Sequence, residues 1–131
     1  MEPCKVLIAD DNTRARLGMR ALLAVSPEIE VVGEATNGLE VLDLIQDRQP
    51  DVVLMDIRMP WLDGLEATRR LKARWPEIKI VVMSMVASHR ARALEAGADK
   101  FLVKGSSIEE LRAAILRPGD IVLSGRSKEE A

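Results

Sequence analysis

The sequence has few of the residues that cross-link, anchor or export a small protein. It has no tyrosine, one phenylalanine and a single cysteine, Cys4, among 131 residues. A lone cysteine excludes an internal disulfide, and without a histidine beside it Cys4 fits a small apolar role in a reducing compartment. The first residues lack the apolar core of a signal peptide, and no apolar run reaches membrane-spanning length. These absences favour a cytoplasmic protein with no membrane partner.

Neither sign of charge dominates the sequence. Lysine and arginine number 19 and aspartate and glutamate 21, which gives a net charge of −2. This balance provides no overall electrostatic attraction to nucleic acid. The chain is 47% hydrophobic and 31% charged, which excludes a disordered chain and allows one domain with a real core. We expect that domain at residues 1–116, followed by a turn-rich and then charged tail or linker stump at 117–131.

Short apolar runs alternate with segments of helical spacing. The runs cover residues 5–10, 29–35, 51–56, 79–84 and 100–104. Their continuous, β-branched character suits strands that are covered on both faces. Strands that alternate with helices predict an α/β fold, a doubly wound parallel sheet of five βα units. The right-handed crossover rule leaves few topologies, and the flavodoxin-like order 2-1-3-4-5 is one of them.

The predicted helices have signals at their starts and apolar faces along their length. Asn37, Asp63 and Ser107 each precede a glutamate by three residues, which is typical of a helix N-terminus. We expect apolar faces at Leu17, Ala21, Leu22 and Leu23 in the first helix, at Leu39, Leu42 and Ile45 in the second, and at Leu65, Thr68, Leu71 and Trp75 in the third.

Charged residues stand at the ends of three of the predicted strands. Asp10 and Asp11 end the first, Asp56 ends the third, and Lys104 ends the fifth. The carboxyl ends of parallel strands share one edge, and in the order 2-1-3-4-5 the crevice lies between strands 1 and 3. The acids therefore face one another, and clustered carboxylates need a cation or a proton. We expect Mg²⁺, which takes one or two carboxylates together with phosphate.

Asp56 is the best candidate for a nucleophile that forms an aspartyl phosphate, because the central strand presents it at the middle of the crevice. Asp10 and Asp11 would then hold the metal, and the backbone carbonyl of Arg58 can add a ligand. An acid just past a strand is often a mere helix cap, a role that Asp11 could fill for the first helix.

Two further groups complete the candidate site. Lys104 provides a compact positive charge for phosphoryl oxygens, and Ser84, at the end of the fourth run, provides a hydroxyl donor. Taken singly, each of these residues favours a structural role, and a lysine that ends a strand is usually solvated. Their common position at one edge of the sheet favours phosphate chemistry.

This set of residues resembles the receiver domain of two-component response regulators, the CheY-like family, over residues 5–116. The resemblance rests on Asp10-Asp11, Asp56-Ile-Arg-Met-Pro60, Asp63-Gly64, Ser84, Leu94-Glu-Ala-Gly97-Ala and Phe101-Leu-Val-Lys104. It implies that Asp56 accepts a phosphoryl group from a sensor histidine kinase or phosphotransfer protein, with Mg²⁺ bound by Asp10, Asp11 and Asp56. It also implies that Ser84 and Phe101 are switch positions. Their movement would alter the face formed by the fourth helix, fifth strand and fifth helix.

The sequence also resembles the subfamily whose receivers precede a LuxR-type helix-turn-helix domain. Gly105 stands where many receivers have proline, and the stretch 63–70 and the tail at 119–124 agree with that subfamily. The resemblance implies an output in transcription, and homodimerisation on phosphorylation is possible. The chain has no DNA-reading module, so we expect no specific DNA binding by the chain alone. A stand-alone receiver that acts through protein contacts remains an alternative.

Two further features, both after the fourth strand, depart from the family pattern. Met85 stands where a small residue is usual, and we expect it to crowd the phosphorylation pocket and slow small donors. The segment from Ser84 to Lys104 is about two residues short, which predicts a short or displaced fourth helix. His89 lies in this segment, where we expect a solvated loop residue.

Other functions fit the sequence less well. A phosphohydrolase of the aspartyl-nucleophile type needs a second aspartate two residues after the nucleophile, where this chain has Arg58. We therefore expect no enzyme with external turnover, and at most slow self-dephosphorylation. A flavin- or nucleotide-binding domain lacks support, because no Gly-rich loop follows the first strand. A receiver that signals without phosphate remains open, although the intact acid set argues against it.

Overall fold

The computed structural model describes residues 2–117. Strands and helices alternate along this part of the chain: β1 (Cys4–Ala9), α1 (Thr13–Ala24), β2 (Ile29–Ala35), α2 (Gly38–Arg48), β3 (Val52–Asp56), α3 (Gly64–Arg74), β4 (Lys79–Ser84), η1 (Ala87–His89, a 3-10 turn), α4 (Arg90–Glu95), β5 (Lys100–Val103) and α5 (Ile108–Leu116). Apart from its first residue, the predicted tail lies outside the described residues. None of the described helices has the length and apolar character needed to cross a membrane.

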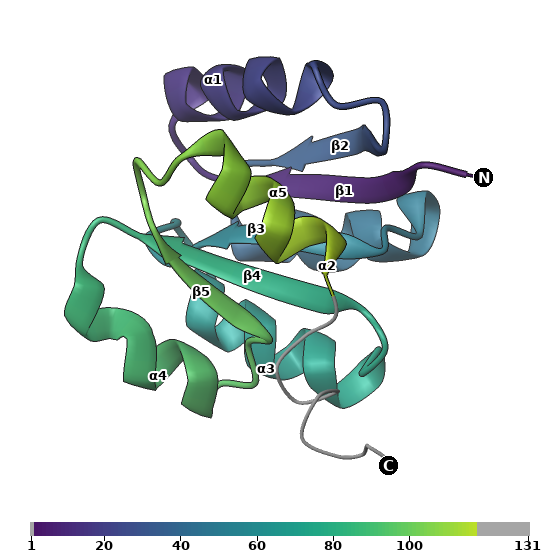
Figure 1. Ribbon diagram of the computed structural model, residues 1–131. Coiled ribbons are helices and arrows are strands. Elements are labelled where there is room, and N and C mark those ends of the chain that lie inside the picture. Colours follow the sequence, from purple (N-terminus) through teal and green to yellow (C-terminus); the bar gives the residue numbers. More distant parts are fainter. Residues whose placement is uncertain (1, 118–131) are drawn as a thin grey trace, which may run out of the picture.

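The five strands form one parallel sheet in the order β2-β1-β3-β4-β5, which confirms the predicted topology. Helices α1 and α5 cover one face of the sheet, and α2, α3 and α4 cover the other (Figure 1). The winding reverses between β1 and β3, which lie side by side at the centre of the sheet. The carboxyl ends of these two strands therefore border the crevice that the sequence predicted.

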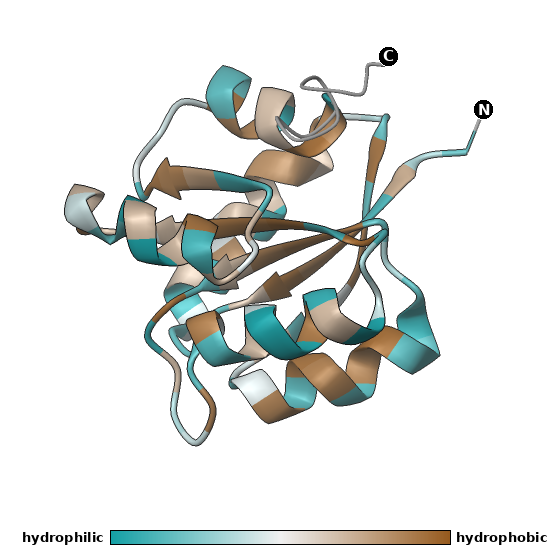
Figure 2. Cartoon of the chain, turned by 90° about the horizontal axis from the view of Figure 1, so that it is seen from below, coloured by the Kyte–Doolittle hydropathy of each residue, from teal (hydrophilic) through white to brown (hydrophobic). Residues whose placement is uncertain are grey.

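The core has two halves, separated by the sheet. Along β3, Val52 and Leu54 point toward α1 and α5, whereas Val53 and Met55 point toward the other three helices. All four side chains are buried, and full burial of each stabilises the fold by roughly 1.5–3 kcal/mol. Figure 2 shows the strands as a mainly brown, apolar centre between helices that carry both brown and teal residues. Burial on both faces explains why the strand runs are continuously apolar.

The predicted helix signals are present. The side chains of Asn37, Asp63 and Ser107 each accept a hydrogen bond from the backbone amide three residues later, at the starts of α2, α3 and α5. The prediction of a short fourth helix is confirmed, because α4 has six residues and follows the single turn η1.

The predicted apolar faces of α1 and α2 are partly wrong. In α1, Leu23 is fully buried, but Leu17 and Leu22 are 58% and 46% exposed. The helix turns Arg16 rather than Leu17 toward the sheet, because the guanidinium group donates a hydrogen bond to a backbone carbonyl at the end of β1. In α2, Leu39 is exposed in the same way.

Gly64 lets the start of α3 approach the end of β3. Its backbone amide donates to the carbonyl oxygen of Ile57 at 2.9 Å. A Cβ atom at Gly64 would lie 2.0 Å from the carbonyl oxygen of Asp56, far inside van der Waals contact. The backbone that presents Asp56 is therefore packed directly against the first turn of α3.

We predict that Gly64→Ala lowers the free energy of unfolding by about 2–4 kcal/mol, because the backbone at Asp56 has to shift to admit the methyl group. Urea denaturation measures this change. The control is Gly18→Ala, since Gly18 lies in α1 with no atom within 4 Å of the added Cβ. That variant should gain about 0.5–1 kcal/mol from helix propensity. Equal effects of the two substitutions would show that the close approach at Gly64 is unimportant.

Candidate functional site

The carboxyl ends of four strands meet at one edge of the sheet. Asp10 directly follows β1, Asp56 ends β3, Ser84 ends β4 and Lys104 directly follows β5. These residues line one hollow of about 330 Å³, and Asp11, Arg58 and Met85 line it with them. The structure thus brings the predicted residues together, with the exception of Phe101.

The three acids form a compact oxygen cluster. One carboxylate oxygen from each of Asp10, Asp11 and Asp56 lies within 4.8 Å of the others. Asp10 and Asp56 are buried, whereas Asp11 is exposed at the mouth of the hollow. Carboxylate oxygens that leave room for water are what Mg²⁺ requires, because this ion keeps several waters and takes few protein ligands. The donor set therefore fits Mg²⁺, and Arg58 lines the same hollow.

Lys104 is the positive group of the hollow. Its Nζ atom is 2.9 Å from Asp10 Oδ2 and 3.3 Å from Asp56 Oδ1. Partial burial is the largest single influence on the pKa of Lys104 and lowers it, but the two carboxylates together outweigh burial and raise the pKa above its usual value. The side chain therefore stays charged and bridges the ends of β1, β3 and β5.

Asp56 is less easily ionised than an ordinary aspartate. Burial raises its pKa most, and the neighbouring charge of Asp10 raises it further. Lys104 and a hydrogen bond from the backbone amide of Arg58 partly offset this rise. The ionised carboxylate thus lies in a place where more positive charge would stabilise it.

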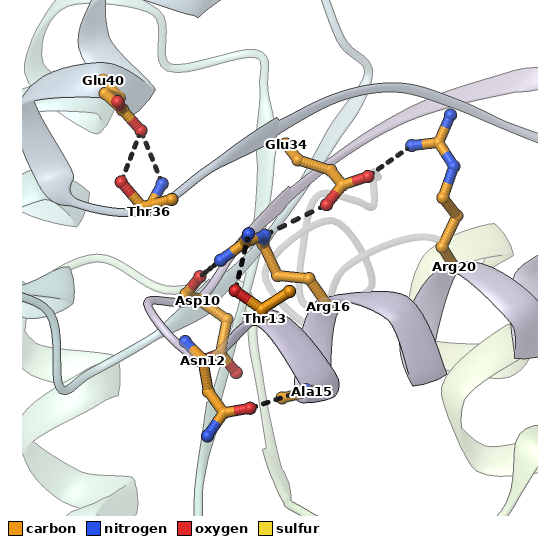
Figure 3. A network of polar contacts seen from close by, with 9 residues as sticks. All are labelled: Asp10, Asn12, Thr13, Ala15, Arg16, Arg20, Glu34, Thr36 and Glu40. Atoms are coloured by element: carbon orange, nitrogen blue, oxygen red, sulfur yellow. Dashed lines mark hydrogen bonds and ion pairs between the residues drawn. The ribbon is translucent and has the colours of Figure 1, made fainter.

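Arg16, Arg20 and Glu34 form a network of polar contacts that fixes the backbone at Asp10, one of the candidate metal ligands (Figure 3). Arg16 Nη1 donates to the carbonyl oxygen of Asp10 at 2.7 Å, and Arg16 Nε donates to Glu34 at 3.0 Å. Arg20 contacts the second oxygen of Glu34 at 2.8 Å. The backbone amide of Asn12 donates to Asp10 Oδ1 at 2.9 Å, which orients this carboxylate. This network could not be predicted from the sequence, since no local pattern links Arg16 to Glu34.

Asp11 is not the cap of the first helix. Asn12 takes that position, and its side-chain oxygen accepts a hydrogen bond from the amide of Ala15 at 2.9 Å. The carboxylate of Asp11 is thereby left exposed beside Asp10 and Asp56. The structural alternative for Asp11 is thus wrong, and its place in the acid cluster is consistent with a metal ligand.

The prediction that His89 is a solvated loop residue is wrong. His89 is half-buried, and its Nδ1 atom lies 2.8 Å from the hydroxyl oxygen of Ser84. The same hydroxyl oxygen accepts a hydrogen bond from the amide of Val86 at 3.0 Å. The tight turn η1 brings the ring back onto the end of β4, a contact that no local sequence pattern indicates.

Two other candidates lie apart from the acids. Phe101 is 7% exposed and belongs to the core beneath α2, α3 and α4, opposite Val82 of β4. It does not line the hollow, so any effect of Phe101 on the site has to pass through the packing of the core. Met85 is 74% exposed and lies on the rim of the hollow.

A larger hollow lies at the opposite edge of the sheet. It measures about 530 Å³ and is lined by the carboxyl-terminal ends of α2 and α3 together with Asp51 and Glu77. The carboxylate of Asp51 already accepts a hydrogen bond from the amide of Lys5 at 2.9 Å. The residues that line this hollow do not combine a group of acids with a lysine. The candidate site therefore differs from it in charge, and volume alone would not have identified the site.

The sequence and the fold have counterparts in known proteins. Residues 6–116 match the family described as the response regulator receiver domain. The chain belongs to this family. Receiver domains of this family are signalling switches of two-component systems rather than enzymes in the usual sense, and they bind Mg²⁺ at acidic residues.

The relatives are response regulators of the NarL and LuxR type. The chain is 38% identical over 128 residues to the nitrate/nitrite response regulator NarL of Escherichia coli, covering 94% of the chain and 59% of NarL. It is 42% identical over 113 residues to the response regulator GacA of Pseudomonas aeruginosa, covering 85% of the chain and 53% of GacA. The chain therefore spans about half the length of the curated relatives it matches.

Solved structures agree with this assignment. The signal receiver domain of NarL from Mycobacterium tuberculosis superposes with a TM-score of 0.83 at 33% identity, covering 88% of this chain and 95% of that one. A LuxR-family response regulator from Aurantimonas superposes with a TM-score of 0.82 at 28% identity, covering 98% and 99%.

We predict that Asp56→Asn raises the free energy of unfolding of the metal-free protein at neutral pH. Because the pKa of Asp56 is raised in the folded state, ionisation of this group favours the unfolded chain, and wild-type stability falls as the pH rises through the folded-state pKa. The advantage of the variant should vanish below about pH 4, where the wild-type carboxyl is protonated in both states.

Urea unfolding in EDTA across this pH range measures the difference. The control is Asp43→Asn, since Asp43 is an exposed acid of α2 outside the hollow. A stability difference for Asp56→Asn that is constant with pH would contradict the electrostatic explanation.

Proposed function

We propose that the chain is a phosphorylation-activated signalling switch in which Asp56 accepts a phosphoryl group. The observation that carries this proposal is the buried Asp56 carboxylate, which has an ammonium group 3.3 Å away and two further acids within 4.8 Å. The donor would be the phosphohistidine of a sensor histidine kinase or a phosphotransfer protein, partners with which receiver domains of two-component systems interact.

In the proposed reaction, a carboxylate oxygen of Asp56 attacks the phosphorus atom, the phosphorus–nitrogen bond breaks, and the imidazole leaves with its electron pair. Asp10, Asp11 and the Asp56 carboxylate would hold Mg²⁺, with the carbonyl of Arg58 as a further ligand. This ion, when bound, neutralises negative charge on the transferring group. Lys104 is already charged and in place, so its ammonium group can shift from a carboxylate to a phosphoryl oxygen.

The output would follow from a change at α4, β5 and α5. Ser84 faces the side of the sheet that α4 covers, since it alternates in step with Val82, and Phe101 lies on that side too. We infer that the Ser84 hydroxyl turns toward the phosphoryl group and that the Phe101 ring, which is already buried, repacks with it. Phosphorylation then acts through differential binding of a partner to the two states.

Transcription control in the cytoplasm is the output we propose, with residues 1–116 as the receiver unit and 117–131 as the start of a linker to a DNA-binding domain. The names of the relatives support this, since one is a transcriptional regulatory protein of Bacillus subtilis. The chain alone would not bind specific DNA, and it would form homodimers on phosphorylation.

Turnover of external phosphate esters is not proposed. The position two residues after the nucleophile candidate is Arg58, whose side chain is exposed. This position therefore offers no second carboxyl group to protonate a leaving group or to activate water. Slow self-dephosphorylation is the hydrolytic activity we expect.

We predict that the wild-type protein is labelled by a cognate kinase or by acetyl phosphate in Mg²⁺, and that Asp56→Asn is not labelled. EDTA should abolish labelling. Asp11→Asn removes one metal-ligand candidate and should weaken Mg²⁺ binding by about tenfold or more, so that labelling needs more Mg²⁺. Phos-tag electrophoresis measures all of these effects, with Asp43→Asn as a surface control. Labelling of Asp56→Asn at the wild-type level would refute the proposal.

We also predict that Met85→Ala is labelled faster than wild type by acetyl phosphate. Met85 lies on the rim of the hollow, so its long side chain narrows the approach of a small donor. Met85→Leu keeps a similar side-chain volume and is the matched control, which should stay near the wild-type rate. Equal rates for wild type and Met85→Ala would show that Met85 does not obstruct the site.

A further inference from the structure

The hydroxyl of Ser84 has a second partner besides the backbone. Its oxygen accepts a hydrogen bond from the amide of Val86 at 3.0 Å and lies 2.8 Å from His89 Nδ1. Ser84 is 5% exposed and its backbone carbonyl accepts from the amide of Lys104 at 2.8 Å, so the residue itself is tied to β5. The hydroxyl therefore lies between the candidate site and the turn that leads into α4.

The number of hydrogen bonds that a hydroxyl can donate and accept indicates whether His89 Nδ1 is the donor or the acceptor. A serine hydroxyl has one hydrogen and two acceptor sites. The Val86 amide occupies an acceptor site, and burial leaves little water for the hydrogen. The hydroxyl of Ser84 is fully hydrogen-bonded when it donates its hydrogen to His89 Nδ1. The ring hydrogen of His89 then lies on Nε2.

We propose that His89 is a positioning residue that restrains the switch. In the unphosphorylated protein its Nδ1 atom accepts a hydrogen bond from the Ser84 hydroxyl, and a phosphoryl oxygen on Asp56 competes as an acceptor for the same hydroxyl hydrogen. The proposal rests on the phosphoacceptor role of Asp56 proposed above. His89 does not line the hollow, so it acts on the phosphoryl group through Ser84 and not by contact.

The same contact restrains α4. His89 closes the turn η1 and directly precedes α4. Of the side chains described between residues 85 and 98, that of His89 makes the one hydrogen bond to the rest of the protein. Transfer of the Ser84 hydroxyl from His89 to a phosphoryl oxygen would free the ring and, with it, the start of the helix on the output face.

A plain structural role for His89 makes a different prediction. If the ring did no more than stabilise the turn, His89→Ala would destabilise the fold, and the binding of a phosphoryl group at Asp56 would be unchanged. If the ring competes with the phosphoryl group, removing it would tighten that binding, and the effect would require Ser84.

The first test measures the affinity for beryllofluoride, which mimics a phosphoryl group on aspartate, in the presence of Mg²⁺. His89→Ala should bind about fivefold more tightly than wild type, as expected for the loss of one competing hydrogen bond. In a Ser84→Ala background the same substitution should have no effect, which is the outcome of a double-mutant cycle for coupled residues. Ser88→Ala, in the same turn, is the control and should match wild type.

The second test uses the fact that His89 is the single histidine of the sequence. In untagged protein with ¹⁵N-labelled histidine at about pH 8, where an ordinary ring is neutral, the two ring nitrogens give one pair of signals. We expect Nδ1 to appear as a hydrogen-bonded acceptor and to lose that hydrogen bond when beryllofluoride and Mg²⁺ are added. Ser84→Ala should show the unbonded ring signal from the start.

The outcomes separate the two proposals. If beryllofluoride binds the wild type and fails to bind Asp56→Asn, the phosphoacceptor role holds. Unchanged ring signals or unchanged affinity in His89→Ala would then overturn the role of His89 alone. If beryllofluoride does not bind the wild type, the proposed function fails, and the restraint by His89 fails with it.

Discussion

The ammonium group of Lys104 lies between the carboxylates of Asp10 and Asp56, and this ion pair joins positions up to 94 residues apart in the sequence. Its members follow or end β1, β3 and β5, so the contact requires all three strands to be parallel and to end at the same edge. One ammonium group faces three acids, which leaves the hollow with an excess of negative charge. Buried charge that is incompletely paired is costly, and a cation relieves that cost.

The walls of the hollow differ in how firmly they are held. On the side of β3, Gly64 and Gly38 allow backbone contacts too close for any side chain, and the amide of Gly38 donates to the carbonyl of Leu62 at 2.9 Å. The loop after Asp56 is thus confined from two directions. On the side of β4, Met85 and its neighbours are exposed, and the hydrogen bonds that hold them to the end of β4 run from the Val86 amide and the His89 ring to one hydroxyl, that of Ser84. The confined loop after β3 keeps the acids in place, whereas the weakly held segment after β4 can move when a ligand binds in the hollow.

The strands, their order and the strand-end residues could be predicted from the sequence because each rests on a local pattern or a general rule. Continuous apolar runs mark strands buried on both faces, and the crevice rule then places Asp56 opposite Asp10. The inward face of α1 could not be predicted, because it depends on Arg16 finding a carbonyl at the end of β1. The contact between His89 and Ser84 likewise depends on the geometry of one short turn, for which the sequence has no period to detect.

The shortness of α4 affects how the protein behaves before any signal arrives. Within the six residues of this helix the one buried side chain is Ala93, and Ala96 just after it is also buried. The side chains of the helix itself therefore contribute little to its anchoring, since a methyl or methylene group accounts for about 0.8 kcal/mol. Elements with few buried apolar contacts are the ones that open at low cost in free energy, so α4 is the element of the output face that is held least firmly by its own side chains. Under the proposed switch function, such a weakly anchored helix would allow some output without phosphate, and phosphorylation would then raise this output rather than create it.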